Sequence, residues 1–134
     1  MDSETVPRYR AAWLALGWLL LCGVAVGSLV PAVPAAAAQI SDKLMHFLAY
    51  AVLAFVFIGA YGRHRWPFFV IGLLLLGAAI ELAQGLLVAS RASEWLDLAA
   101  NSAGVATGTL VALAIPGNWC RHVERRLGFD GQGA

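Results

Sequence analysis

The sequence predicts an all-α fold, an integral membrane bundle of four transmembrane helices with both termini in the cytoplasm. Of its 134 residues, 60% are hydrophobic and 13% are charged, whereas a soluble domain usually carries about 25% charged residues. Most of the apolar residues fall in four runs, each near the ~20 residues that a bilayer-spanning helix requires. No alternation of period two is sustained, and a closed β-barrel needs more strands than this length supplies.

The four apolar runs are bounded by prolines and charged residues. Pro31 ends the first run, Pro67 occupies the first helical position of the third, and Pro116 stops the fourth. The charged pair Asp42 and Lys43 precedes the second run. The expected helices cover residues 11–30, 44–61, 67–88 and 95–115. They form one transmembrane domain, 11–115, between an N-terminal segment, 1–10, and a basic tail, 116–134, both expected in the cytoplasm.

Basic residues predict the orientation of the bundle. Seven arginines lie before the first run, between the second and third, or after the fourth, whereas only Lys43 and Arg91 lie in the other two connections. The seven are Arg8, Arg10, Arg63, Arg65, Arg121, Arg125 and Arg126. Because cytoplasmic loops of membrane proteins carry the excess of Lys and Arg, both termini are predicted to be cytoplasmic.

The first apolar run has a second interpretation. Arg8 and Arg10, the apolar run and then Ala-Val-Pro-Ala-Ala-Ala-Ala-Gln also fit a cleaved signal peptide. The run of about 20 apolar residues exceeds the ~7–15 residues of a signal core, so we expect a retained helix. Sequencing of the mature protein that starts near Gln39 would show cleavage instead.

Nine polar residues in or beside the last three helices are the candidates for a site. They are Asp42, Lys43, His46, Tyr50, Glu81, Gln84, Arg91, Asp97 and Asn101. An ionisable group inside the hydrocarbon costs roughly 2.5–3.5 kcal/mol even on insertion scales, so it normally faces a partner or water. Spacings of three and four residues place the set of each helix on one face. In the predicted orientation, all nine belong to the outer half of the membrane.

Two glycines continue the polar face of the fourth helix. Gly104 and Gly108 follow Asp97 and Asn101 near helical spacing. Small residues let membrane helices approach closely, so we expect these glycines at a helix contact.

Structural roles explain single members of the polar set. Asp42 suits an N-cap, and Asp97 suits the first turn of a helix, where negative charge is favourable. Glu81 has Lys43, Arg91 and His46 as candidate ion-pair partners. For the set as a whole, we favour a binding or catalytic site, because three helices place polar groups at the same depth in the membrane.

The polar residues resemble the signature of the VanZ-like family. Residues 42–50, Asp-Lys-Leu-Met-His-Phe-Leu-Ala-Tyr, resemble its DKxxHfxxY motif. The order Glu81, Gln84, Arg91, Asp97, Asn101, Gly104, Gly108 resembles its ExxQ…R…D…N…G…G pattern, and the match covers about residues 30–115. Ser93-Glu94 adds an acid to this pattern without breaking it. The resemblance implies a multi-pass protein of the bacterial inner membrane, linked to the cell envelope and, for the family's namesake, to low-level teicoplanin resistance.

One function that suits these residues is binding of membrane lipid, in particular an anionic lipid-linked envelope precursor, at the outer leaflet. Lys43 and Arg91 would contact phosphate or carboxylate, Arg91 with a bidentate fork. His46, Gln84 and Asn101 would add hydrogen bonds. The acids Glu81 and Asp97 would orient the basic groups.

Two other functions stay open. An enzyme acting on such a lipid would use His46, Glu81 and Asp97 as acid–base groups or as a metal site of one imidazole and two carboxylates. No serine elbow or HExxH spacing supports this, and we assign no metal and no cofactor. An accessory subunit would dock a membrane partner, or a second copy, through the polar cluster. The scattered basic residues give no reason to expect nucleic acid.

Overall fold

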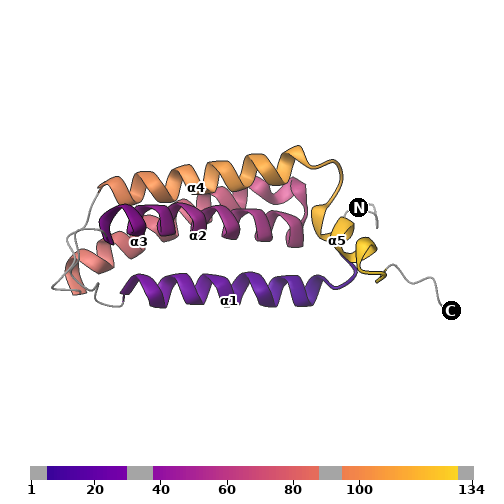
Figure 1. Cartoon of the computed structure of the whole chain (residues 1–134), viewed down its shortest axis with the longest axis horizontal. Coiled ribbons are helices and arrows are strands. Elements are labelled where there is room, and N and C mark those ends of the chain that lie inside the picture. Colours follow the sequence, from indigo (N-terminus) through magenta and orange to yellow (C-terminus); the bar gives the residue numbers. More distant parts are fainter. Residues whose placement is uncertain (1–5, 30–37, 88–94, 130–134) are drawn as a thin grey trace.

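The structure is a computed structural model that describes residues 6–29, 38–87 and 95–129. Those residues form no strand and contain the helices α1 (Arg10–Leu29), α2 (Ala38–Tyr61), η2 (Arg63–Arg65, a 3-10 turn), α3 (Trp66–Leu87), α4 (Trp95–Ala114) and α5 (Trp119–Arg126). α1, α2 and α4 run along one common axis and α3 crosses them obliquely (Figure 1), and each of the four is long and apolar enough to cross a membrane. The predicted all-α fold with four membrane-spanning helices is therefore confirmed.

Most helix boundaries agree with the sequence pattern, and that of α2 differs. α1, α3 and α4 begin and end within one residue of the expected positions, whereas α2 begins at Ala38 instead of residue 44. Asp42 and Lys43 consequently lie inside α2, and Asp42 is not its N-cap. Asp97 lies in the first turn of α4, as expected.

α2 is the central helix of the bundle. Its side chains Tyr50, Leu53, Ala54 and Phe57 form the buried core with one residue each from α3 and α4. By contrast, α1 buries only Gly17 along its described length. Large apolar side chains lie exposed on the outer surface of all four long helices, among them Leu19, Val52, Phe68, Leu86 and Leu110. Such a surface is suited to lipid and not to water.

α2 and α4 are parallel and touch through their backbones. Gly104 lies against the carbonyl of Phe47, and Gly108 lies against the carbonyl of Ala51. A methyl group at either glycine would overlap that oxygen. Small residues at such a contact let membrane helices pack closely where lipid supplies no hydrophobic driving force. A bulky residue at either position would therefore disrupt the packing of the chain itself.

The two ends of the chain meet through Glu124 of α5. Its buried carboxylate accepts hydrogen bonds from the backbone N–H groups of Arg8, at 2.8 Å, and Tyr9, at 2.9 Å. The indole Nε1 of Trp13 donates to the same carboxylate at 2.9 Å. Since α1 begins at Arg10, Glu124 places a negative charge at a helix N-terminus, which is favourable.

α5 is absent from the elements expected from the sequence, and it is docked on α2. Asn118 caps α5 by accepting from Cys120 N and also donates to Gly59 O at 2.8 Å. Trp119 donates to Phe55 O at 3.0 Å and stacks on the Phe55 ring at 4.3 Å between centroids. The residues after α4 are therefore part of the folded bundle up to the end of α5.

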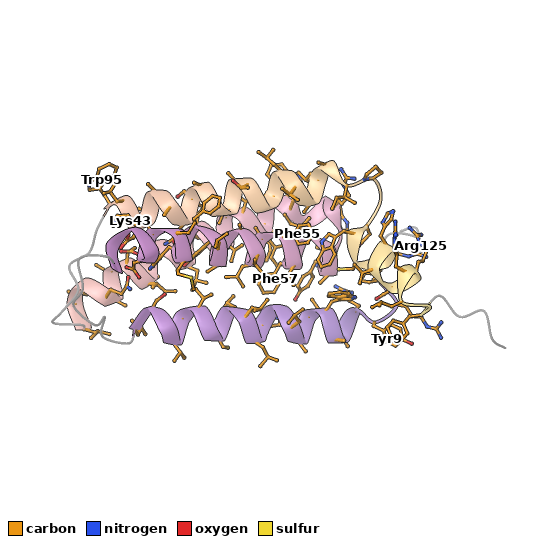
Figure 2. All side chains as sticks on the ribbon, in the orientation of Figure 1. Tyr9, Lys43, Phe55, Phe57, Trp95 and Arg125 are labelled. Atoms are coloured by element: carbon orange, nitrogen blue, oxygen red, sulfur yellow. The ribbon has the colours of Figure 1, made fainter. Side chains whose placement is uncertain are left out.

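The arginines that the structure describes gather at the end of the bundle where both chain termini lie, which we call the terminal end. Figure 2 shows Arg125 and Tyr9 there, with Lys43 and Trp95 at the opposite end. Arg63 donates to the carbonyls of Leu113 and Ile115 at the end of α4, where a cation is favoured. A chain that crosses the membrane an even number of times has both termini on the same side, as they are here. That this side is the cytoplasm stays a prediction.

Gly108→Ala should destabilise the bundle by about 3 kcal/mol or more, the upper end of overpacking costs, because the new methyl group meets backbone and not a movable side chain. Gly72→Ala is the matched control, since a Cβ there meets no atom within 4 Å. Thermal unfolding in detergent measures both. Equal melting temperatures for the two variants would contradict the backbone contact.

Cys120 should resist thiol reagents in the folded protein. Burial, with a smaller contribution from Glu124, raises the pKa of its thiol from 9.0 to about 12. Since the thiolate is the reactive form, maleimide labelling at pH 8 in a Cys22→Ala background should be about a thousandfold slower than for an ordinary thiol. Arg125→Cys in a chain lacking both native cysteines is the exposed control on the same helix. Similar rates for the two thiols would show that α5 is not docked.

Candidate functional site

The end of the bundle opposite the termini, the polar end, carries the N-terminal parts of α2 and α4 and the C-terminal part of α3 (Figures 1 and 2). Lys43 of α2 donates to Asp97 Oδ1 of α4 at 3.1 Å. The ion pair is partly exposed, with 29% of the Lys43 side chain and 10% of the Asp97 side chain accessible. Glu81, for which Lys43, Arg91 and His46 were candidate partners, lies beside His46.

His46 is the centre of the cluster. Its side chain is 7% exposed, and its Nδ1 lies 3.0 Å from Asn101 Oδ1 of α4 and 3.9 Å from Glu81 Oε1 of α3. Because an amide oxygen only accepts hydrogen bonds, Nδ1 carries the hydrogen in this arrangement. The other ring nitrogen, Nε2, lies 4.0 Å from Asp42 Oδ1. The imidazole thus connects three helices and stands between two carboxylates.

Tyr50 lies deeper in the bundle than His46. The Tyr50 ring is 1% exposed, and its hydroxyl has no hydrogen-bond partner among the described residues. A Cβ on Gly77 of α3 would lie 3.4 Å from that hydroxyl and 3.3 Å from Asn101 Nδ2. Gly77 therefore gives the polar side chains of α2 and α4 the room to approach α3.

Gln84, which was expected to supply a hydrogen bond to a ligand, bonds to the backbone of α1 in the structure. Its Nε2 donates to the backbone carbonyl of Ser28 at 2.7 Å. Ser28 is the second-last residue of α1, so its carbonyl has no partner within the helix. Gln84 thus ties the C-terminal end of α1 to α3.

Three ligand-type side chains converge at the polar end. Asp42, His46 and Asp97 each offer a nitrogen or carboxylate oxygen, and the three atoms lie within 4.8 Å of one another. No metal was assigned from the sequence. The residues considered there for a metal site were His46, Glu81 and Asp97, whereas the three that converge in the structure include Asp42 and not Glu81. The structure places Glu81 on the opposite side of the imidazole from Asp42.

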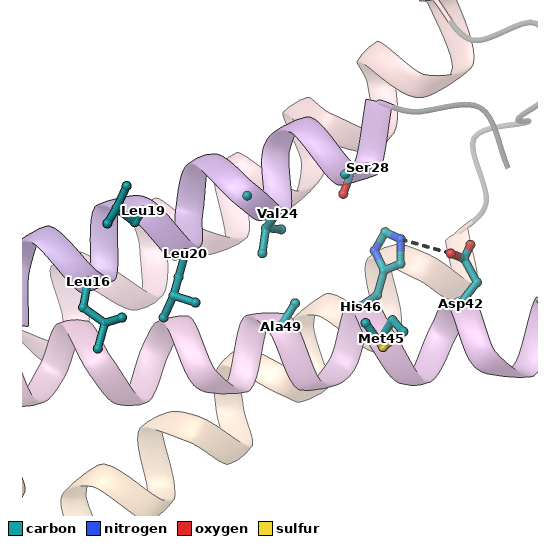
Figure 3. A pocket seen from close by; sticks show the side chains of 11 residues that line it. Leu16, Leu19, Leu20, Val24, Ser28, Asp42, Met45, His46 and Ala49 are labelled. Carbon is teal, nitrogen blue, oxygen red and sulfur yellow. Dashed lines mark ion pairs between the residues drawn. The ribbon is translucent and has the colours of Figure 1, made fainter.

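A groove of about 560 Å³ runs between α1 and α2 and ends at these residues (Figure 3). Its walls are apolar, formed by Leu16, Leu19, Leu20 and Val24 of α1 and by Met45 and Ala49 of α2. Ser28, Asp42 and His46 line its polar end. Gly23 and Gly27 also line it, and a Cβ on either would meet no atom within 4 Å. The groove is amphiphilic, with a long apolar part and one polar end.

The structure brings together most of the sequence-derived candidates. Asp42, Lys43, His46, Glu81, Asp97 and Asn101 share the polar end, Tyr50 lies below them, and Gln84 binds α1 instead. Arg91, with Ser93 and Glu94, lies outside the described residues. The groove was missed, because α1 contributes only small and apolar side chains and the backbone carbonyl of Ser28. The repeat of Gly23 and Gly27 is the one signal in the sequence that marks it.

The fold and the site define an all-α, multi-pass membrane protein with a polar cluster at one end of the bundle. Comparison of the chain with family models, curated proteins and solved structures finds no match.

Gln84→Met should lower stability without removing the polar cluster. Loss of the hydrogen bond to Ser28 should cost about 0.6–1.7 kcal/mol, the range found for hydrogen bonds between membrane helices. Leu86→Met is the control on the same helix, since Leu86 is exposed. Thermal unfolding in detergent gives both values. An unchanged melting temperature for Gln84→Met would mean that Gln84 does not hold α1 in place.

Proposed function

We propose that the protein is a VanZ-like protein of the bacterial inner membrane that binds an anionic lipid-linked precursor of the cell envelope. The hydrocarbon chain lies in the groove between α1 and α2, and the charged head group lies at the polar end. Binding of this lipid affects tolerance of envelope-directed antibiotics, in particular glycopeptides.

The shape and lining of the groove carry this proposal. Its volume of about 560 Å³ falls within the roughly 300–1,000 Å³ of ligand sites, which combine apolar walls with a few placed polar groups. The apolar part matches a hydrocarbon chain, and the polar end at Asp42 and His46 matches a head group. α1 leaves this space because it packs on α2 through Gly17 against Phe57, while Gln84 holds its other end on α3.

The positive charge for an anionic head group comes from Lys43. It follows Asp42 directly in the chain, and its hydrogen bond to Asp97 holds the ammonium group at the polar end while part of the side chain stays accessible. A charge-assisted hydrogen bond to phosphate is about twice as strong as a neutral one. Lys43 is therefore the described cation best placed to select an anionic lipid.

The arginines support the proposed orientation. Those that the structure describes lie at the terminal end, and an excess of Lys and Arg marks the cytoplasmic side of membrane proteins. The polar end then lies in the outer leaflet, where lipid-linked precursors of the envelope are used.

Gly27→Leu should fill the groove without touching the polar residues, and it should reduce co-purified anionic lipid at least tenfold. Lys43→Ala should also reduce it by removing the charge. Gly72→Leu is the matched control, because Gly72 also has open space at its Cβ but lies on α3, away from the groove. Lipid mass spectrometry of the full-length protein, purified in mild detergent, measures the bound lipid.

Retention of wild-type amounts of anionic lipid by Gly27→Leu would refute the groove as the binding site. The same spectra distinguish binding from catalysis. Intact lipid released by the wild type supports a binding protein, whereas lipid that has lost its head group only when His46 is present supports an enzyme. Susceptibility of cells carrying each variant to a glycopeptide panel tests the link to tolerance.

A further inference from the structure

We infer that Asp42, His46 and Asp97 bind a divalent transition-metal ion, Zn²⁺ or Mn²⁺, at the polar end of the groove. The inference goes beyond lipid binding and does not depend on it, because the ion is bound by this chain's own side chains.

The positions of the ligand atoms are the first support. One atom each from Asp42, His46 and Asp97 lie within 4.8 Å of one another. Bonds of about 2.0–2.2 Å in tetrahedral geometry place two ligands of one zinc ion about 3.4 Å apart. Side-chain rotations that bring the three atoms closer by up to about 1.4 Å are therefore needed to close them on one ion.

The tautomer of His46 is the second, independent support. Its Nδ1 is 3.0 Å from Asn101 Oδ1 and 3.9 Å from Glu81 Oε1, so two negative atoms face it and it carries the hydrogen. The lone pair of the neutral ring is then on Nε2, which has no hydrogen bond to a described residue and faces Asp42 Oδ1 at 4.0 Å (Figure 3). Two lone-pair atoms that face each other repel, and a metal ion between them would be attracted to both. Metal-binding histidines show this same pattern, with the second nitrogen donating to an oxygen that fixes the tautomer.

The positions of the two ring nitrogens also indicate which carboxylates bind the ion. Asp42 lies on the Nε2 side of the ring and Glu81 lies on the Nδ1 side, so Asp42 is a ligand and Glu81 is not. Asp97 holds Lys43 through Oδ1, and its second oxygen is left for the ion. Glu81 and Asn101 then act as positioning residues that hold the imidazole.

The donor set indicates the kind of ion. One imidazole with two carboxylates suits zinc, which takes nitrogen and oxygen ligands, and manganese, which favours carboxylates. Three protein ligands leave at least one position for water or another molecule. Because Asp42 and His46 line the groove, that position opens toward it, where an anionic oxygen of a bound molecule would complete the coordination.

Metal content of the full-length protein tests the inference. Protein in detergent is stripped with chelator, incubated with Zn²⁺ or with Mn²⁺ alone, desalted and analysed by mass spectrometry of the metal. The wild type should hold about one ion per chain. Asp42→Asn, His46→Gln and Asp97→Asn should each lower the affinity at least tenfold. Glu81→Gln, which alters a positioning residue but not a ligand, should lower the affinity less than the three ligand variants do, and His122→Gln at the terminal end should keep the ion.

Spectroscopy supplies a readout that a general loss of structure would not give. Bound Mn²⁺ should show coupling to one imidazole nitrogen in pulsed electron paramagnetic resonance, and the coupling should be absent in His46→Gln. Asn101→Ala should weaken binding about 10–100-fold, as loss of a hydrogen bond to a metal-bound histidine does. Asp42 is 36% exposed, so Asp42→Asn keeps the fold and remains informative if another variant does not.

Failure of the wild type to hold either ion would overturn the inference. Binding that is unchanged in Asp42→Asn, or equally lost in Glu81→Gln, would overturn the proposed ligand set. Since no lipid is added in these experiments, their outcome is independent of the groove variants.

Discussion

The backbone contact between α2 and α4 determines the rest of the structure. Gly104 and Gly108 let α4 lie directly against the carbonyls of Phe47 and Ala51, and this contact fixes the register of two parallel helices. One turn before it, the same register pairs His46 with Asn101, and a further turn away it pairs Lys43 with Asp97. The contacts between α2 and α4 in the polar cluster are therefore a consequence of how the two helices pack, and a shift of α4 by one turn would separate both pairs.

The other two long helices complete the site in different ways. α3 brings Glu81 to the imidazole, because Gly77 leaves room for Tyr50 and Asn101 beside it. α1 is held mainly near its two ends, by Glu124 and the Phe57 contact on one side and by Gln84 on the other. Between those attachments it leaves the groove open. A rigid core of α2, α3 and α4 thus presents the polar groups, and a peripheral helix forms the apolar wall.

The sequence predicts the four helices well, because an apolar run of the right length has few alternatives in a membrane. It also places Asp42, His46, Asp97 and Asn101 near one end, since helical spacing and topology set their depth. It does not predict which side chains meet, as the partner of Lys43 or Gln84 depends on the register between helices. The groove and α5 are the least predictable features. The groove results from the absence of side chains at Gly23 and Gly27. The docking of α5 depends on single contacts of Asn118, Trp119 and Glu124 within a basic segment.

Helix register brings His46 and Asn101 into contact, and a double-mutant cycle tests this contact. His46→Ala, Asn101→Ala and the double variant are compared by reversible unfolding in detergent. The hydrogen bond between His46 and Asn101 should give a coupling free energy of about 1 kcal/mol, typical of a buried hydrogen bond between helices. His46→Ala combined with Ser102→Ala, whose hydroxyl bonds within its own helix, should show additive effects. Additivity within about 0.3–0.5 kcal/mol for the His46 and Asn101 pair would contradict the contact and the cluster built on it.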